Sequence, residues 1–473
     1  MRAAAIPAFQ RAVPARPALA AILRGPGPWM VLAFLATIAY GIYLGPSWEP
    51  LQDDQADYLQ LAQGVAARAE FTRAAPGEAF IAEPHRRPGY PLFLASLCRT
   101  AGCDHWQIAI VQALLFAAAV ALTYVLARRI VPRGAALAAA LVAVYLPIAY
   151  LASLALSEML ATFLLLLTVF LYLRSRTHGS AWAFASGAAA GYLALTRPLF
   201  TLLPLVLVAI EFVADPESRA RRPRAVLAIF LGAALLGLPF LAYTYASFGG
   251  PLTSTSGTVL WSGYLQGKTD GAPADLDRFR AAALARADDE SILRLGSAIG
   301  LDEVESREAA GAFRDVASFD SAADQRARVA AFVTLNESLY ARALRLIAHD
   351  PAGYVIRGIA VRTPALFATD VPVRVADTSS LPLGVRVALF AGELVLFAGA
   401  LAGTLLLVRR RTAAAAIVAG VFVYVWVLSV PFLAEGRYAI PARPFMAISL
   451  AVVISYLVSR RTSTRMVEAT LPG

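Results

Sequence analysis

Three aspartates stand close together early in the chain, and their type and spacing could support chemistry. Asp53, Asp54 and Asp57 lie in the stretch DDQADYLQLAQ, a few residues after the apolar run 29–45. A carboxylate beside hydrocarbon is unfavourable unless it is paired, so this cluster indicates a general base or a ligand set for a hard cation. Asp54 and Tyr58 share a face if the stretch is helical. The simpler alternative is that these acidic residues only cap a helix.

Further charged residues lie next to other apolar runs. They are His85, Arg86 and Arg87 in the loop after the aspartates, Glu158 in SLALSEML, Arg197 in LTRPLF, and Glu435 and Arg437 in EGRYAIPARP. Arginine presents planar, bidentate donors that suit phosphate oxygens. Taken one at a time, Glu158 could be an interfacial residue that snorkels to water, and the arginines could be surface charge or headgroup anchors. Their meaning depends on whether the fold brings them together.

The composition indicates a membrane protein. The 473 residues are 59% hydrophobic and only 16% charged, with a mean hydropathy of +0.62, which lies outside the range of soluble globular proteins. Apolar runs predict about ten transmembrane helices, at residues 29–45, 106–127, 134–151, 155–173, 181–197, 199–213, 225–244, 384–408, 413–433 and 440–459. Much of the formal net charge of +10 lies in arginine-rich loops, so it indicates membrane topology and not nucleic acid binding.

The arginine-rich loops predict the orientation of these spans. The basic amino terminus and the clusters at 128–133, 174–176, 219–224, 409–411 and 460–461 all fall on one side of a ten-span arrangement. The positive-inside rule assigns that side to the cytoplasm. The aspartates and the other charged residues described above then converge on the outer surface of the membrane.

This topology divides the chain into four parts. We expect a cytoplasmic basic leader (1–28) and an N-terminal transmembrane module (29–244) that includes the first outer loop, 46–105. An outer helical insert (245–383) follows, and its helical pattern around residues 329–347 predicts one apolar face that packs on the bundle. The last part, 384–473, contains the C-terminal transmembrane helices and a short cytoplasmic tail.

Two shorter features carry separate expectations. The segment 354–368 includes Arg357 and Arg362 in a short apolar run, which is typical of an amphipathic helix in the membrane interface. Cys98 and Cys103 lack the further ligands of a zinc site, and on the outer side they could form a small disulfide or remain two free thiols.

Five motifs occur in an order that resembles the GT-C superfamily of membrane glycosyltransferases, especially bacterial relatives of protein O-mannosyltransferases and of the lipid A aminoarabinose transferase. They are DDQADYLQLA, RPGYPLFLA, Ser-Glu-x-Leu, Thr-Arg-Pro, and Glu-x-Arg-Tyr followed by a later proline. The resemblance covers most of the chain and implies a GT-C fold. It also implies a transferase that moves a sugar from a polyprenyl-phosphate donor to an acceptor hydroxyl at the extracytoplasmic face.

The resemblance also implies roles for individual residues. Asp54 matches the catalytic base best, with Asp53 as the alternative, and Tyr58 stands at the expected distance. The donor phosphate would be held by Arg86 or Arg87, together with Arg197 and Arg437. Further site candidates are Tyr90, Glu158, Lys268 in the glycine-rich GYLQGKTDG, Glu435 and Tyr438, although an ordinary flexible loop is the simpler interpretation for Lys268.

A sugar phosphate already has a stable anionic leaving group, so the reaction needs one base and several cations but no separate acid. With no separate nucleophile evident, the expected outcome is inversion at the anomeric carbon. No cofactor is expected to be required, and Mg²⁺ or Mn²⁺ held by the aspartates and Glu158 is the alternative. No metal-ligand motif stands out among the four histidines.

The expected location is the bacterial inner membrane, with many spans and an active site that faces the periplasm or the outside. The expected partners are the lipid-linked sugar donor, membrane lipid, and an envelope glycolipid, polysaccharide or protein as acceptor. A transporter or flippase of a lipid-linked sugar is the alternative function, but the repeated halves and broken helices typical of transporters are not evident in the sequence. The motifs do not specify the sugar, the acceptor, the carrier length or the oligomeric state.

Overall fold

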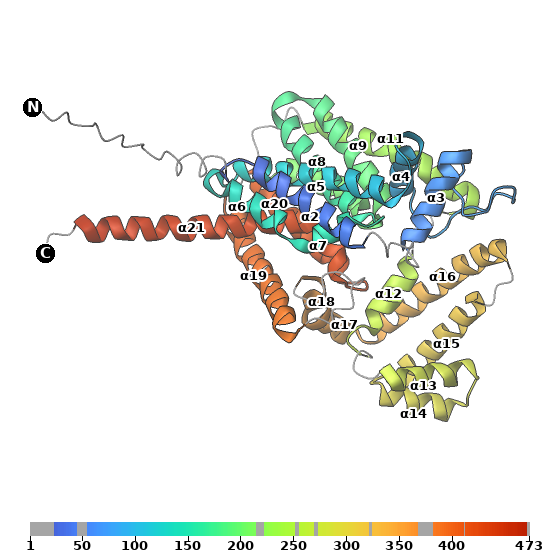
Figure 1. Ribbon diagram of the computed structural model, residues 1–473. Coiled ribbons are helices and arrows are strands. Elements are labelled where there is room, and N and C mark those ends of the chain that lie inside the picture. Colours follow the sequence, from blue (N-terminus) through green and yellow to red (C-terminus); the bar gives the residue numbers. More distant parts are fainter. Residues whose placement is uncertain are drawn as a thin grey trace, which may run out of the picture.

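The computed structural model describes residues 23–44, 54–213, 222–250, 255–268, 273–320, 324–367, 382–410 and 412–470. Within these ranges the chain is predominantly helical and contains no β-strand (Figure 1). The expected all-α membrane architecture is therefore confirmed for this part of the chain.

The first half of the chain forms a helical bundle with a large apolar core. Its main elements are α2 (Gly27–Leu44), α3 (Asp54–Arg68), α4 (Gly89–Thr100), α5 (His105–Arg128), α6 (Ala135–Ala143), α7 (Leu146–Ala152), α8 (Glu158–His178), α9 (Ser180–Thr196), η3 (Pro198–Leu202), α10 (Leu203–Val213) and α11 (Arg222–Phe248). Buried alanine, leucine, valine and isoleucine side chains of α5, α6 and α8 fill this core together with residues from the last helix of the chain.

Two glycines bring α9 and α11 into backbone contact. A Cβ atom added at Gly187 would lie 2.0 Å from the carbonyl oxygen of Ile229, and one added at Gly232 would lie 2.1 Å from the carbonyl oxygen of Phe184. This close approach through small residues is typical of helix pairs in membranes. Because α9 leads directly into Arg197, the contact fixes where that arginine lies.

The segment between α11 and α19 forms a helical unit with its own core. Its elements are α12 (Ser256–Leu265), α13 (Pro273–Leu284), α14 (Asp289–Ala298), α15 (Glu303–Asp320), α16 (Gln325–His349), α17 (Pro351–Arg357), the π-helical turn η5 (Gly358–Arg362) and α18 (Thr363–Phe367). The expected apolar face of α16 buries Phe332, Asn336 and Ala343. This face packs mainly on α12 and α15 of the same unit, and therefore less on the bundle than expected.

Arg362 is buried within the helical segment that the sequence predicted. Its side chain is only 1% exposed, whereas Val355, Ile356 and Ile359 of the same segment are exposed. Its guanidinium donates hydrogen bonds to the carbonyl oxygens of Val430 at 2.6 Å, Gly263 at 2.8 Å and Tyr354 at 2.7 Å. Backbone carbonyls satisfy the buried cation, so this arginine joins the insert to the turn after α20.

The C-terminal part contains α19 (Leu383–Val408), α20 (Ala413–Ser429), η7 (Gly436–Ala442) and α21 (Arg443–Thr470). A buried ion pair links α19 to α21, with Arg443 Nη1 2.8 Å from Glu393 Oε2. The two side chains are 1% and 4% exposed. The hydroxyl of Tyr145, at the break between α6 and α7, donates a hydrogen bond to the other oxygen of Glu393.

All ten predicted spans coincide with helices, but the helices differ in length. Within the described residues, five helical segments are long and apolar enough to cross a membrane: α5, α8, α11, α19 and Gly436–Arg460. The predicted span 134–151 is a pair of helices bent by 55°. Three further apolar helices, Gly27–Tyr43, Pro198–Phe212 and Ala413–Ser429, are shorter. The predicted span 181–197 coincides with α9, which has 17 residues.

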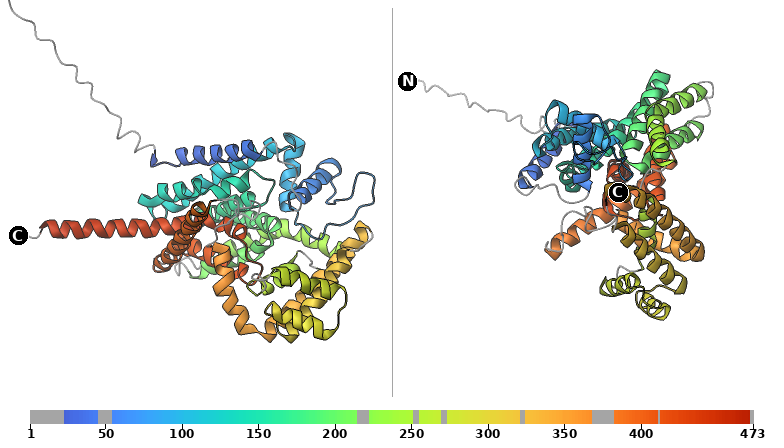
Figure 2. Two further views of the ribbon diagram at one scale, coloured as in Figure 1. Left: turned by 60° about the horizontal axis from the view of Figure 1, so that its bottom comes forward. Right: turned by 90° about the vertical axis from the view of Figure 1, so that its right-hand side faces the viewer.

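The elements are arranged between two ends of the molecule (Figure 2). The start of α2 and the end of α21 lie at one end, whereas α3, α4 and the insert lie at the other. We call the second of these the site end. The two long segments predicted to share one side of the membrane, 46–105 and 245–383, therefore have their described helices α3, α4 and α13 to α16 at the same end.

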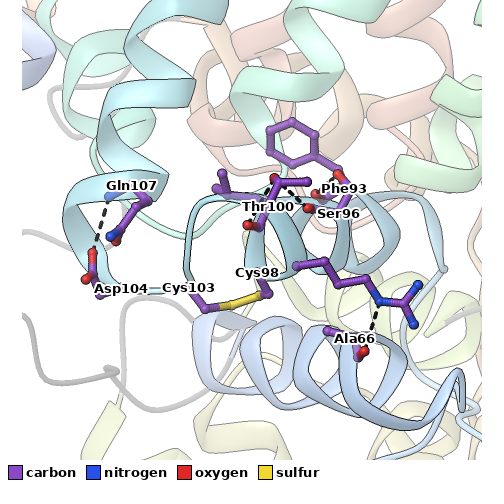
Figure 3. Close-up of a disulfide and its surroundings, with 10 residues drawn as sticks. Ala66, Phe93, Ser96, Cys98, Thr100, Cys103, Asp104 and Gln107 are labelled. Atoms are coloured by element: carbon purple, nitrogen blue, oxygen red, sulfur yellow. Dashed lines mark hydrogen bonds between the residues drawn. A yellow bond between two sulfur atoms is a disulfide. The ribbon is translucent and has the colours of Figure 1, made fainter.

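A disulfide joins Cys98 at the end of α4 to Cys103 in the following turn (Figure 3). Arg99, between them, donates hydrogen bonds to the carbonyl oxygens of Ala66 at 2.9 Å and Val65 at 3.0 Å, near the end of α3. The stapled turn thus holds the C-terminal end of α3, the helix whose first residue is Asp54.

Candidate functional site

The helix α3 begins at Asp54, so the described part of the stretch DDQADYLQLAQ is helical. Both carboxylate oxygens of Asp54 are paired: Oδ1 lies 2.7 Å from Arg86 Nη2, and Oδ2 lies 2.8 Å from Arg437 Nη1. Asp57 is one turn further along and also contacts Arg86, at 2.9 Å. Asp53, the alternative base, lies outside the described residues.

Arg437 continues this network toward α8. Its Nε donates to Glu435 at 3.1 Å, and its Nη1 lies 3.8 Å from Glu158 Oε1. The same Glu158 oxygen accepts a hydrogen bond from Arg197 Nη2 at 2.5 Å. Since Glu158 is only 1% exposed, it acts as a buried anion that holds two guanidinium groups side by side.

A cavity of about 450 Å³ opens beside these ion pairs. Its polar wall contains Asp54, Tyr58, Arg86, Arg87, Arg197, Arg437 and Tyr438. Its apolar wall contains Leu199 and Leu202 of η3, Leu428 of α20, Val259 of α12, and Phe432 and Leu433 of the turn after α20. The cavity thus combines clustered guanidinium groups with a hydrophobic surface, which suits an amphiphilic ligand that carries an anion.

The electrostatics of the cavity favour an ionised Asp54. Burial alone would raise the pKa of Asp54, but the Arg86 and Arg437 guanidiniums outweigh it and bring the pKa below its usual value. Burial, with Arg73 and Arg86 nearby, lowers the pKa of His85 to about 4, so this ring is neutral near pH 7. The guanidiniums of Arg86 and Arg437 therefore favour the carboxylate form of Asp54, which is the form that can accept a proton.

Arg86 and Arg87, between which the sequence left the phosphate role open, both line the cavity. Arg86 is paired with two carboxylates, whereas Arg87 Nη1 donates to the carbonyl oxygen of Ala194 at 2.8 Å and to Thr201 Oγ1 at 3.1 Å. Burial lowers the pKa of Arg87 to about 10, which still leaves it a cation at neutral pH.

The remaining candidates lie at different distances from the cavity. Glu158 and Glu435 do not line it, but they contact the arginines that do. Tyr90 is fully buried behind it, with its ring edge-to-face against Tyr58 at a centroid distance of 4.9 Å. Lys268 does not line the cavity, and its ammonium group is paired with the buried Glu305 inside the insert.

Several cavity residues carry no sequence motif. The insert contributes Thr255 and Ser256 at the start of α12, and α20 contributes Ser429. His85 also lines the cavity and stacks on Phe332 of the insert at a centroid distance of 3.6 Å. The insert is therefore a direct part of the site. Of these residues, only His85 had a signal in the sequence, which was its position beside Arg86.

The carboxylates fit a divalent metal poorly in this arrangement. Within the described ranges, no group of three or more histidine, cysteine or acidic side chains is close enough to hold a metal ion. Both oxygens of Asp54 face guanidiniums, and the Glu158 oxygen nearest Arg197 faces two. A divalent cation placed there would meet the repulsion of Arg86, Arg197 and Arg437.

Comparisons with known proteins agree with this architecture. The sequence pattern of the dolichyl-phosphate-mannose-protein mannosyltransferase family matches residues 83–243. The oligosaccharyltransferase of Archaeoglobus fulgidus in its apo form superposes with a TM-score of 0.52 at 16% identity, covering 94% of this chain and 52% of that one. The chain has the GT-C fold. The GT-C fold that the resemblance implied is thus confirmed.

Two further GT-C structures are similar. AglB from Archaeoglobus fulgidus, in complex with an inhibitory peptide and a dolichol-phosphate, has a TM-score of 0.50 at 14% identity and covers 95% of this chain. ArnT from Cupriavidus metallidurans, bound to undecaprenyl phosphate, has a TM-score of 0.40 at 15% identity, covering 97% of this chain and 82% of that one. This chain spans 52% of the length of AglB. A comparison with curated proteins gives no match.

Proposed function

We propose that this GT-C protein is a glycosyltransferase that moves a sugar from a polyprenyl-phosphate donor to an acceptor hydroxyl, with Asp54 as the general base. The observation that carries the proposal is the position of Asp54. It lies on the wall of a cavity, ionised and between two guanidinium groups. A base and a cluster of cations beside one cavity are what transfer from a sugar phosphate requires.

In the proposed reaction the acceptor oxygen attacks the anomeric carbon while the bond from that carbon to the phosphate oxygen breaks. The acceptor proton passes to Asp54, and the polyprenyl phosphate leaves with the bonding electron pair. The guanidiniums of Arg197 and Arg437, which Glu158 holds side by side, stabilise the negative charge on the departing phosphate. One displacement at carbon inverts the anomeric configuration.

Arg437 contacts Asp54, so donor binding at Arg437 would change the base as well. A phosphate that takes hydrogen bonds from Arg86 and Arg437 leaves fewer of them for Asp54. The carboxylate then becomes more basic when the donor is present. The acceptor hydroxyl would therefore meet a stronger base only in the donor-bound enzyme.

The apolar wall of the cavity supports a lipid-linked donor. Leu199 and Leu202 of η3 lie on this wall, and Leu202 is 48% exposed on the outside of the bundle. An isoprenoid chain could follow η3 from the cavity into the bilayer, since burying its methylene and methyl groups there is favourable. The dolichol-phosphate bound to the structurally similar AglB is a ligand of the same kind.

We further propose that the site end faces the periplasm from the inner membrane of a bacterium. Two observations support this orientation. The arginine-rich clusters all belong to the opposite side of the predicted topology. The Cys98–Cys103 disulfide lies at the site end, and such bonds persist in an oxidising compartment. The acceptor would then be an envelope glycolipid, polysaccharide or protein.

The test uses the purified protein in detergent or nanodiscs with a panel of undecaprenyl-phosphate-linked sugars and a mixture of envelope glycolipids as acceptors. We expect release of undecaprenyl phosphate and a glycosylated product of inverted anomeric configuration. A product with retained configuration would overturn direct displacement. Movement of the intact donor across proteoliposome membranes without any transfer would instead establish the transporter function.

A further inference from the structure

A closed ring of ion pairs and hydrogen bonds lies behind the cavity and holds Arg86 at both ends. Asp57 Oδ2 accepts from Arg86 Nε at 3.0 Å and lies 2.9 Å from Nη2. Its other oxygen, Oδ1, accepts from Arg73 Nη1 at 2.7 Å. Arg73 Nε in turn donates to Glu83 Oε2 at 2.6 Å.

Glu83 closes the ring on the backbone of Arg86. Its Oε1 accepts hydrogen bonds from the backbone amides of His85 at 2.7 Å and Arg86 at 3.1 Å. The ring therefore runs from the amide of Arg86 through Glu83, Arg73 and Asp57 to the guanidinium of Arg86. The same ring therefore fixes both the backbone amide and the guanidinium of Arg86.

The ring is anchored to two helices. Gln60 Nε2 of α3 donates to the carbonyl oxygen of Arg73 at 2.8 Å. The hydroxyl of Tyr243 in α11 accepts from the backbone amide of Glu83 at 2.9 Å. Glu83 is only 4% exposed, and Asp57 and Arg73 are 22% and 23% exposed at the side chain, so solvent screens these charges incompletely.

Asp54 and Asp57 both contact Arg86, but they stand in different places. Asp54 lines the cavity, whereas Asp57 lies behind Arg86 and does not. An arginine with five donors on a flexible stem loses much side-chain entropy when it binds an anion. A guanidinium already fixed from behind has lost that freedom before the ligand arrives.

We propose that Asp57 and Arg73 are positioning residues, which fix the guanidinium of Arg86 for the donor phosphate through the ring that Glu83 closes. This inference rests on the proposed function, because it assigns Arg86 a phosphate ligand. Neither Asp57 nor Arg73 lines the cavity, so both act through Arg86. Their effect is to keep Arg86 at the cavity wall when phosphate and Asp54 compete for it.

The test measures binding of undecaprenyl phosphate to the full-length protein by titration calorimetry. We compare Asp57→Asn and Arg73→Met with two matched controls from the same loop region. The control for the carboxylate is Glu70→Gln, because Glu70 pairs with Arg68 away from the cavity. The control for the arginine is Arg99→Met, because Arg99 holds the other end of α3.

We expect affinity to fall about tenfold in Asp57→Asn and Arg73→Met, and to change less than about twofold in the controls. Asp57→Glu should restore part of the affinity. In turnover assays KM for the donor should rise more than kcat falls. Hydrogen exchange at the amides of His85 and Arg86 should increase in Arg73→Met and not in Arg99→Met.

Equal affinities for wild type and the two ring variants, at whatever melting temperature, would overturn the inference. A ring that only stabilises the fold would lower the melting temperature without changing the affinity of the folded protein. If the wild-type protein itself does not bind undecaprenyl phosphate, the proposed function is what fails. The wild-type titration therefore separates the two outcomes.

Discussion

Asp54 and Arg437 are 383 positions apart in the sequence, yet their side chains form a 2.8 Å ion pair at the wall of one cavity. The pair joins the helix that follows the first span to the turn that precedes the last one. Both side chains are largely buried. Removal of either one would therefore leave the charge of the other unpaired in a buried position. The pair therefore links the two halves of the proposed mechanism, proton transfer and phosphate binding.

Asp54→Asn should abolish transfer and preserve donor binding. Loss of a general base typically lowers the rate by about 10²- to 10⁴-fold. Binding of undecaprenyl phosphate should persist or tighten, since Arg86 and Arg437 lose a competing carboxylate. Single-turnover assays beside a binding titration measure both effects. A fully active variant would move the base to another residue, of which Asp53 is the first to test.

Arg437→Met should weaken donor binding by about 10- to 100-fold, the usual effect of removing a hydrogen bond to a charged group. It should also move the acid limb of the kcat/KM profile to higher pH. Arg437 helps to hold the pKa of Asp54 below its usual value, so its loss raises that pKa and the base becomes protonated sooner.

Arg278→Met is the matched control for this arginine, because Arg278 lies exposed on the insert and pairs only locally with Asp275. An unchanged affinity in Arg437→Met would leave Arg437 as an anchor for lipid headgroups. An acid limb that moves to lower pH would contradict the assigned effect on Asp54.

Acidification should loosen the contact between the first loop and the insert. Burial lowers the pKa of His85 to about 4, below the value near 6.5 that it has when unfolded. The unfolded chain therefore takes up a proton first, and stability falls as the pH drops from about 6.5 toward 4. His85→Phe keeps a ring against Phe332 and removes the titration. Its melting temperature should depend less on pH over that range.

Burial is the largest cause of the lowered pKa of His85, and the charged groups that face the ring modify it. Arg73 and Arg86 disfavour its protonated form, and Asp57 favours it. Thermal melts of both proteins at several pH values above and below 6 give the comparison. Parallel pH curves for wild type and His85→Phe would show that other groups cause the acid sensitivity.

Removal of the disulfide should lower stability with little effect on chemistry. A loop this short gains about 2 kcal/mol from closure in the chain-entropy account. The double variant Cys98→Ser and Cys103→Ser should melt at a lower temperature and retain its KM for the donor, because neither residue lines the cavity. Labelling with a thiol reagent before and after reduction measures the state of the bond directly.

Activity should survive exhaustive chelation. The proposed site places guanidiniums where a metal-dependent enzyme would place a cation, and Arg86, Arg197 and Arg437 already oppose its carboxylates. Transfer assays after dialysis against EDTA, with Mg²⁺ or Mn²⁺ added back, provide the measurement. Loss of activity that Mn²⁺ restores would contradict this expectation.

The sequence predicted those parts of the structure that depend on local patterns. Apolar runs located the helices, and residues next to those runs included Asp54, Arg86, Arg197 and Arg437, which the fold brings to one cavity. The predicted topology was enough to place these four residues on the same side of the membrane. Their pairing could not be predicted, because the distance between Asp54 and Arg437 depends on how the last turn packs against α8.

Residues without a motif were missed. Arg73 and Glu83 look like ordinary loop charges in the sequence, and only the folded loop brings both to Asp57 and Arg86. Lys268 shows the opposite case. Its glycine-rich motif made it a candidate site residue, but in the structure it pairs with Glu305. A buried carboxylate three helices away has no signature in the sequence around Lys268.

The Glu393–Arg443 pair has a consequence for biosynthesis. A ribosome produces α19 before α21, so Glu393 reaches the bilayer while its counterion has not yet been synthesised. A lone acidic residue at the centre of a helix opposes translocon-mediated insertion by about 2.5–3.5 kcal/mol. We therefore expect the membrane insertion of α19 to carry part of this cost until α21 is synthesised, with the hydroxyl of Tyr145 already present as a hydrogen-bond partner of Glu393. A chain truncated before Arg443 should be less stable than the full chain, because Glu393 then lacks its counterion.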